Sequence, residues 1–142
     1  MLEQCTTYVD LLDNHSELTN DELKWFDNVV SICKDAIGVN IPIITYDHEL
    51  LNSSSKDALG IFWTTDEKHP LNGESFITID CCTIHELYET KFNNGFDLIF
   101  DTLEGIIAHE LAHGFQFRHC KRHRTITAEF LERIHEYEKA VL

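Results

Sequence analysis

Two histidines and a glutamate stand in the pattern His-Glu-x-x-His, at His109, Glu110 and His113, within an apolar stretch. On the helix that this stretch predicts, residues four apart share one face, so both imidazoles can reach one metal ion. Glu110 lies about 100° further around the helix, within reach of a water on that ion. Such patterns also arise by chance, but the apolar frame and further histidines nearby argue against chance here. The residues predict the chemistry of a zinc hydrolase.

A tetrahedral catalytic zinc site needs a third protein ligand and an open position for water. On an unbroken helix Cys120 would share the face of the second histidine, but about 10 Å along the axis, too far to bind the same ion. The helix is therefore predicted to end and the chain to turn back. His119 is the first choice for the third ligand, and the alternatives are His123 and then Glu129 or Glu132.

Composition predicts a single globular domain over residues 1–142, with 43% hydrophobic and 25% charged residues. No apolar run approaches the roughly 20 residues of a membrane span, and the polar first residues do not resemble a secretory signal. The chain has five cysteines, an odd number, which favours reduced thiols over a disulfide framework. A cytoplasmic protein without a membrane partner is expected, and the sequence does not indicate its oligomeric state.

The net charge of −14 is unevenly distributed. Residues 1–103 contain 19 acidic residues and 5 lysines, whereas residues 104–142 contain 6 acidic and 6 basic residues. A chain this acidic argues against nucleic acid as a partner. Four bases nevertheless fall within seven residues: Arg118, Lys121, Arg122 and Arg124. Either these cations lie in solvent at the C-terminal end of a helix, where they interact favourably with the helix dipole, or they guide an acidic substrate.

Hydrophobic periodicity predicts an α+β fold: N-terminal helices, a short and mostly antiparallel sheet with a hairpin, the metal-binding helix and a C-terminal helix. The predicted helices cover 2–13, 19–38, 84–92 and 127–142, and the predicted strands cover 39–46, 58–65 and 74–80. Thr19 and Glu22 form a predicted capping box. Asp101 is the expected cap of the metal-binding helix, which can also begin near Asp97, and Thr125 or Thr127 that of the last helix.

Over roughly residues 40–130 the chain resembles the zincin metallopeptidases, most closely the small SprT-like and YgjP-like proteins. The matching features are a hairpin that carries Gly60, the His-Glu-x-x-His helix, His119 and Phe130. Metzincins share the spacing of six residues to the third histidine, but here Gln116 replaces their glycine and Met1 is the sole methionine. The resemblance implies a small helix-plus-sheet fold, one zinc ion and hydrolysis of a peptide bond.

These features predict a zinc-dependent metallopeptidase that acts on protein or peptide substrates, with His109, His113 and His119 as ligands of Zn²⁺. Glu110 is then the general base that takes a proton from water and passes it to the leaving amine. A second hypothesis is a non-catalytic zinc protein that acts as a binding or regulatory module. Such a site is closed by four protein ligands, and the further candidates for it are Cys81, Cys82, Cys120 and His123.

Overall fold

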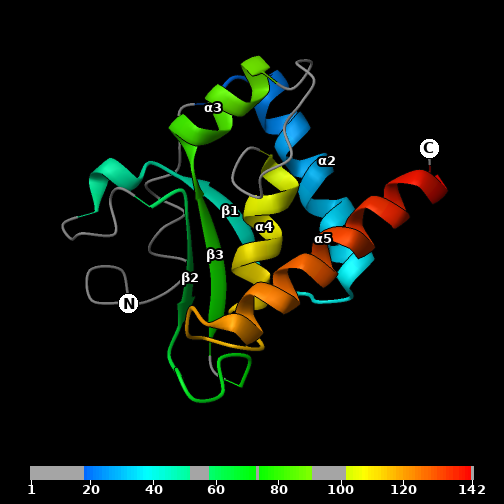
Figure 1. Ribbon diagram of the computed structural model, residues 1–142. Helices are drawn as coiled ribbons and strands as arrows, with labels where there is room; N and C mark the ends of the chain where they lie inside the picture. Colours follow the sequence, from blue (N-terminus) through cyan, green and yellow to red (C-terminus); the bar gives the residue numbers. More distant parts are fainter. Residues whose placement is uncertain (1–17, 52–57, 73, 91–101, 142) are drawn as a thin grey trace.

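The computed structural model describes residues 18–51, 58–72, 74–90 and 102–141. These residues form four α-helices, one short 3₁₀-helix and a three-stranded sheet (Figure 1). In chain order they are α2 (Asn20–Ile37), β1 (Ile43–Tyr46), η1 (His48–Leu50), β2 (Gly60–Thr64), β3 (Ser75–Asp80), α3 (Cys81–Thr90), α4 (Leu103–Ala112) and α5 (Lys121–Val141). The α+β prediction is confirmed, and the helix predicted over 2–13 lies outside the described residues.

The sheet has the strand order β1-β3-β2, so β3 is central and β2 lies at an edge. The predicted hairpin is confirmed, because β2 and β3 pair antiparallel with Phe62 opposite Ile77. On the other side β1 pairs with β3 in parallel, with Ile43 also opposite Ile77. The sheet is therefore mixed, whereas the sequence predicted a mostly antiparallel one. Apolar alternation identifies strands and their buried face, but it carries no information on strand direction.

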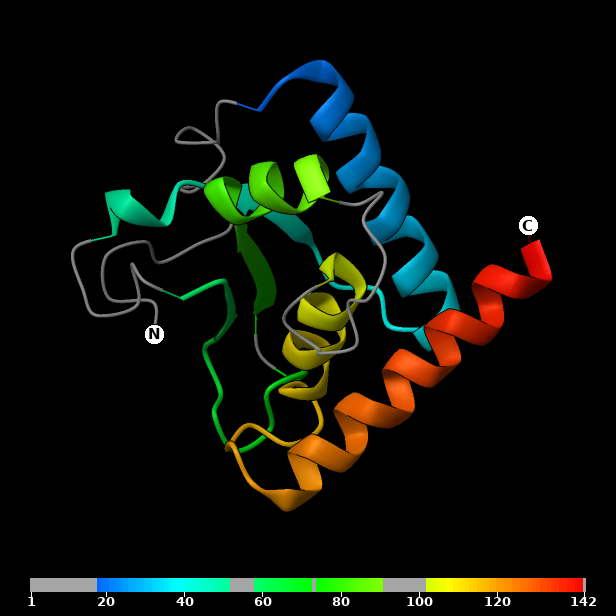
Figure 2. The same cartoon turned by 45° about the horizontal axis from the view of Figure 1, so that its top comes forward.

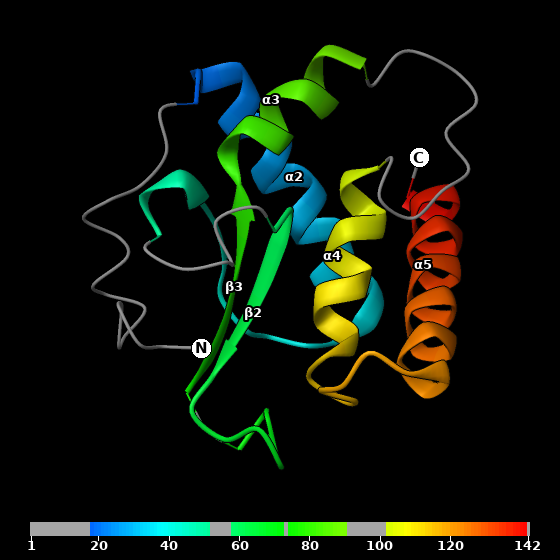
Figure 3. The ribbon, with the colours of Figure 1, turned by 60° about the vertical axis from the view of Figure 1, so that its left-hand side comes forward.

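Helix α4 lies at the centre of the molecule, between the sheet and α5 (Figure 3). It also packs against α2, and Figure 2 shows α4 (yellow) with α2 (blue to cyan) and α5 (orange to red) beside it. Outside the side that carries His109, its apolar side chains are fully buried: Ile106, Ile107, Ala108, Leu111 and Ala112 each have 0% exposure. Burial of this kind is the main stabilising contribution to such a core. In the described part of the chain, no helix has the length and apolarity needed to cross a membrane.

The ends of α2 follow the sequence prediction. Thr19 and Glu22 make the reciprocal hydrogen bonds of a capping box: the Thr19 hydroxyl accepts from the Glu22 backbone, and the Glu22 carboxylate accepts from the Thr19 backbone. Gly38 ends the helix with φ of +81° and donates its N–H to the Lys34 carbonyl at 2.7 Å. Glycine suits this position because a left-handed backbone strains residues that have a Cβ atom.

The later helices begin at other residues than predicted. The cap of α4 is Thr102, whose hydroxyl accepts from the Gly105 N–H at 3.0 Å, while Asp101 lies outside the described residues. Helix α3 begins at Cys81, directly after β3, and α5 begins at Lys121. Thr127 is therefore no cap of α5: it lies inside the helix, where its hydroxyl donates to the His123 carbonyl at 2.9 Å. A hydroxyl can bond back to the preceding turn, so a threonine alone does not fix a helix start.

A buried polar network fixes the beginning of β2 to the rest of the sheet. His48, with 0% exposure, donates from Nδ1 to the Ala58 carbonyl at 2.7 Å and accepts at Nε2 from the Thr78 hydroxyl at 2.9 Å. The Trp63 indole donates to the same hydroxyl at 2.9 Å. Because each of these polar groups has a partner, the network holds β2 in place without an unsatisfied buried atom.

Candidate metal site

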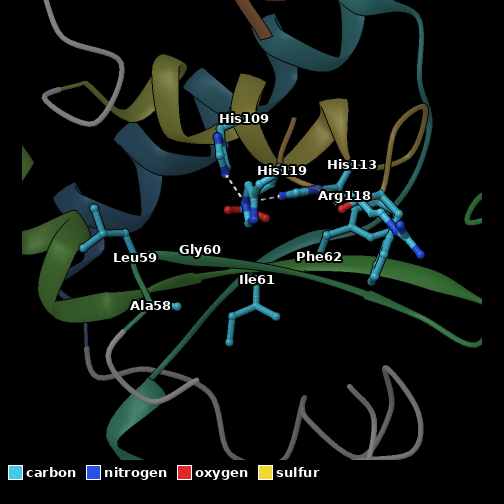
Figure 4. Close-up of a pocket in the computed structure, with 11 residues that line it drawn as sticks. Ala58, Leu59, Gly60, Ile61, Phe62, His109, His113, Arg118 and His119 are labelled. Atoms are coloured by element: carbon cyan, nitrogen blue, oxygen red, sulfur yellow. Dashed lines mark hydrogen bonds between the residues drawn. The ribbon is translucent and has the colours of Figure 1, made fainter. Parts of the chain in front are cut away.

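The two histidines of the sequence pattern converge with a third one on a common point. His109 lies on α4, and His113 is the C-cap residue directly after that helix. Each Nε2 faces the Nε2 of His119, at 3.2 Å and 3.1 Å respectively (Figure 4). Three imidazole nitrogens this close place their lone pairs in the same small volume. That arrangement is stable only with a proton or a cation among them.

His119 reaches this point because the chain turns back after α4, as the sequence predicted. Helix α4 ends at Ala112, whose carbonyl accepts from the N–H groups of both Phe115 and Gln116. Gly114 lies in the turn against Leu71 of the hairpin loop, where a Cβ atom would come within 2.9 Å of the leucine Cδ2 atom. Glycine therefore lets the turn pack against the Leu71 side chain without displacing it. The turn returns the chain so that His119 faces the exposed side of α4.

A fourth histidine, His123, approaches the pair from α5. It is 1% exposed, and its ring stacks on that of His113 with centroids 4.1 Å apart. One ligand atom from each of His109, His113 and His123 lies within 4.8 Å of the others, so these three form a possible metal site. The Nε2 atom of His123, however, donates to the His109 carbonyl at 3.0 Å. This bond leaves only Nδ1 of His123 for a metal.

His109 and His113 are held in the neutral form that a metal ligand needs. Burial, together with the neighbouring histidines, lowers the pKa of His109 to about 3 and that of His113 to about 4. His113 also donates from Nδ1 to the Phe117 carbonyl at 2.7 Å, which leaves the lone pair on Nε2. Sequence reasoning missed Phe117, because any residue supplies a carbonyl and no side-chain pattern signals it.

Glu110 is buried beside the histidines, with 5% exposure. Burial raises the pKa of its carboxyl to about 8. Gly60 of β2 lies directly against it, since a Cβ atom there would come within 3.0 Å of the Glu110 Cγ and 3.1 Å of Oε2. The carboxyl is thus confined between the edge strand and α4, on the wall of the cavity that His109 and His113 also line.

These groups open onto one cavity of about 680 Å³. Its wall consists of the edge strand with the residues before it, the exposed side of α4 and the turn that follows α4 (Figure 4). The lining residues are Ala58, Leu59, Gly60, Ile61, Phe62, His109, Glu110, His113, Phe117, Arg118 and His119. A cavity of this size with an apolar wall and a few convergent polar groups is typical of a ligand-binding site.

The other candidate ligands lie elsewhere. Glu129 and Glu132 line a separate hollow between α2 and α5, with no histidine in it. Cys81 is grouped with Asp47 and Asp80 at the start of α3, away from the histidines. Within the described ranges, no cysteine has a ligand atom in the His109 group.

Neither a protein-family model, nor a curated protein, nor a solved structure matches this chain. The functional interpretation therefore depends on the residues and their geometry.

Replacing Gly60 by alanine is expected to lower the rate of the peptide hydrolysis predicted from the sequence by about 10–100-fold, because the new methyl group displaces the Glu110 carboxyl. The backbone of Gly60 has an ordinary φ, so alanine causes no backbone strain there, and the expected effect comes from the steric contact with Glu110. Gly38→Ala is the matched control: nothing lies within 4 Å of its Cβ position, but its φ of +81° strains alanine. This control should lose stability and keep its turnover per folded molecule. Equal rates for Gly60→Ala and wild type would show that this contact does not position Glu110.

The metal-free protein is expected to lose stability as the pH rises between about 6.5 and 8.5. Burial raises the pKa of Glu110 from its ordinary 4.5 to about 8. The contribution of this group to the free energy of unfolding is therefore complete below pH 4.5 and is lost as the pH rises through 8. The pKa values of His109, His113 and His123 are lowered, so these residues change the free energy of unfolding only below about pH 6.5. Urea unfolding of chelator-treated protein at a series of pH values measures the free energy of unfolding. Glu110→Gln should flatten this pH dependence and Glu136→Gln, an exposed control on α5, should not.

Proposed function

We propose that this protein is a zinc-dependent peptidase in which His109, His113 and His119 bind the metal. The observation that carries the proposal is the convergence of the three Nε2 atoms, at 3.1 and 3.2 Å from His119 to the other two. Ligands at about 2.0–2.1 Å from a tetrahedral zinc are separated from one another by roughly 3.3 Å. Both separations thus fit ligands of one zinc ion, and the cavity beside the histidines leaves room for a water and a substrate.

Glu110 has the position of a general base. Zinc, when bound, lowers the pKa of water at its open position and polarises a carbonyl group. The Glu110 carboxylate lies next to His109 in sequence and faces the same cavity, so it can take a proton from that water and deliver it to the leaving amine. A cation nearby also lowers the pKa of Glu110 and favours its ionised form.

The cavity wall supports a peptide as the substrate. In the described sheet β2 is an edge strand, and no described strand pairs with it on the side away from β3. Residues 60–62 of this strand line the cavity that contains the histidines and Glu110. An extended peptide can pair with such an edge through its backbone, which places a peptide bond beside the catalytic groups.

The alternative is a closed structural zinc site, and the position of His123 is the observation that favours it. Four protein ligands would leave no position for water. His123 has a ligand atom within 4.8 Å of His109 and His113, although its Nε2 is already bonded to a carbonyl. The cavity beside the three converging histidines favours the open site over the closed one.

Metal content and peptide hydrolysis of the purified protein test the proposal. We expect one zinc per chain, cleavage of a mixed quenched-fluorescent peptide library, loss of cleavage on treatment with a chelator, and recovery on addition of zinc. X-ray absorption spectroscopy should find four nitrogen or oxygen ligands, with the multiple-scattering signal of three imidazole rings. A chain that binds no zinc even after its addition would contradict the proposal. Zinc with four protein ligands and no cleavage would establish the structural alternative.

A further inference from the structure

One exposed cation lies at the wall of the catalytic cavity. Most of the lining is apolar, and its charged side chains are the buried Glu110 and the exposed Arg118. Arg118 follows the Phe117 carbonyl that orients His113, and it precedes His119. The fold therefore holds its backbone next to the metal ligands, whatever the conformation of its side chain.

Arg118 also borders a second hollow of about 440 Å³. The two hollows share Phe117 and Arg118, and the second one continues to the hairpin loop, where Lys68 and Glu67 line it. Two cations and one carboxylate thus surround a space that adjoins the catalytic cavity. A substrate that extends out of the cavity past Phe117 enters this space.

Neither cation forms an ion pair within the described part of the chain. Among the described residues, Arg118 and Lys68 have no carboxylate partner at ion-pair distance. This is notable in a chain of net charge −14, where acidic groups are abundant. A guanidinium group binds a carboxylate through two parallel hydrogen bonds, and these charge-assisted bonds are stronger than neutral ones.

We propose that Arg118, assisted by Lys68, forms a subsite for an acidic side chain of the substrate, aspartate or glutamate, within a few residues of the cleaved bond. The inference rests on the proposed peptidase function and adds the substrate class. The apolar wall at Leu59, Ile61 and Phe62 accepts the neighbouring substrate side chains. The preferred substrates are thus peptides that combine apolar residues with a nearby carboxylate.

The experiment compares peptides that carry glutamate or glutamine at each of three positions on either side of the cleaved bond. For wild type, glutamate at one of these positions should raise kcat/KM about tenfold over glutamine, the effect of one hydrogen bond to a charged group. Arg118→Gln should remove this preference and keep the zinc content. Arg122→Gln on α5, which lines neither hollow, is the matched control and should keep the preference. The preference should also decrease with added salt.

Binding separates this inference from the peptidase proposal. Fluorescence anisotropy with zinc-loaded Glu110→Gln protein, which is expected not to cleave, measures the affinities of the same peptides. Tighter binding of the glutamate peptide that disappears with Arg118→Gln supports the subsite, even if wild type cleaves nothing and the peptidase proposal fails. Three results would overturn the subsite. Wild type could cleave glutamate and glutamine peptides at equal rates, Arg122→Gln could lose the glutamate preference as fully as Arg118→Gln, or the protein could bind none of the peptides.

Discussion

Replacing Glu110 by glutamine is expected to lower peptide hydrolysis by about 100–10,000-fold, the usual contribution of a general base, while one zinc per chain is retained. Glutamine has nearly the shape of glutamate but does not accept a proton at neutral pH. Since Glu110 is 5% exposed and confined by Gly60, the isosteric change should leave the packing intact. The measurement is kcat/KM on one peptide, with zinc content determined on the same preparation.

Glu129→Gln is the control for this variant, because Glu129 is an exposed residue that lines the separate hollow at α5. It should hydrolyse the peptide at the wild-type rate. If Glu110→Gln also cleaved at that rate, Glu110 would not be the base. Loss of zinc from Glu110→Gln would instead indicate that this carboxylate binds or supports the metal.

The second large effect concerns the third ligand. His119→Ala is expected to weaken zinc binding on the order of 1,000-fold, beyond the 10–100-fold that loss of an outer hydrogen-bonding partner costs. The reason is the position of its Nε2, 3.1 Å from His113 and 3.2 Å from His109. Because His119 is exposed, the variant should unfold in urea much as the metal-free wild type does. Competition with a chromophoric chelator measures the zinc affinity.

His123→Gln is the partner variant for that measurement. His123 is 1% exposed and bonded to the His109 carbonyl, so glutamine, which keeps a donor, is a safer replacement than alanine. We expect a decrease in zinc affinity of about tenfold, as for an outer partner. The opposite ranking, with the larger loss in His123→Gln, would assign the third ligand to His123. Retention of zinc in both variants would contradict either assignment.

The fold and part of the site could be predicted from short-range patterns. The capping box at Thr19, the glycine end at Gly38 and the hairpin are local, because the residues that specify them lie close together in sequence. His109, Glu110 and His113 belong to the same class, since one helix turn fixes their relation. The end of α4 was predicted because a third ligand on an unbroken helix would lie too far from the two histidines to bind the same ion.

What the sequence did not reveal depends on contacts between distant segments. The parallel pairing of β1 with β3 leaves no trace in apolar alternation. His48 was not singled out, because its partners at Ala58 and Thr78 are ten and thirty residues away. The start of α5 at Lys121 was missed, since its first turn is polar and carries no apolar stripe. Because α5 starts this early, His123 lies on α5, close to His109 and His113.

The buried apolar side chains of α4 have a consequence for how the protein would bind the proposed metal ion. In small zinc-finger domains the metal supplies the folding free energy, so removal of the metal unfolds the chain. Here the helix that carries His109 and His113 is fixed by side chains with 0% exposure, such as Ile106 and Leu111. The binding energy of the ion is then not consumed in ordering the backbone. Occupancy should follow the free concentration of the metal, and the ion should exchange in a molecule that stays folded.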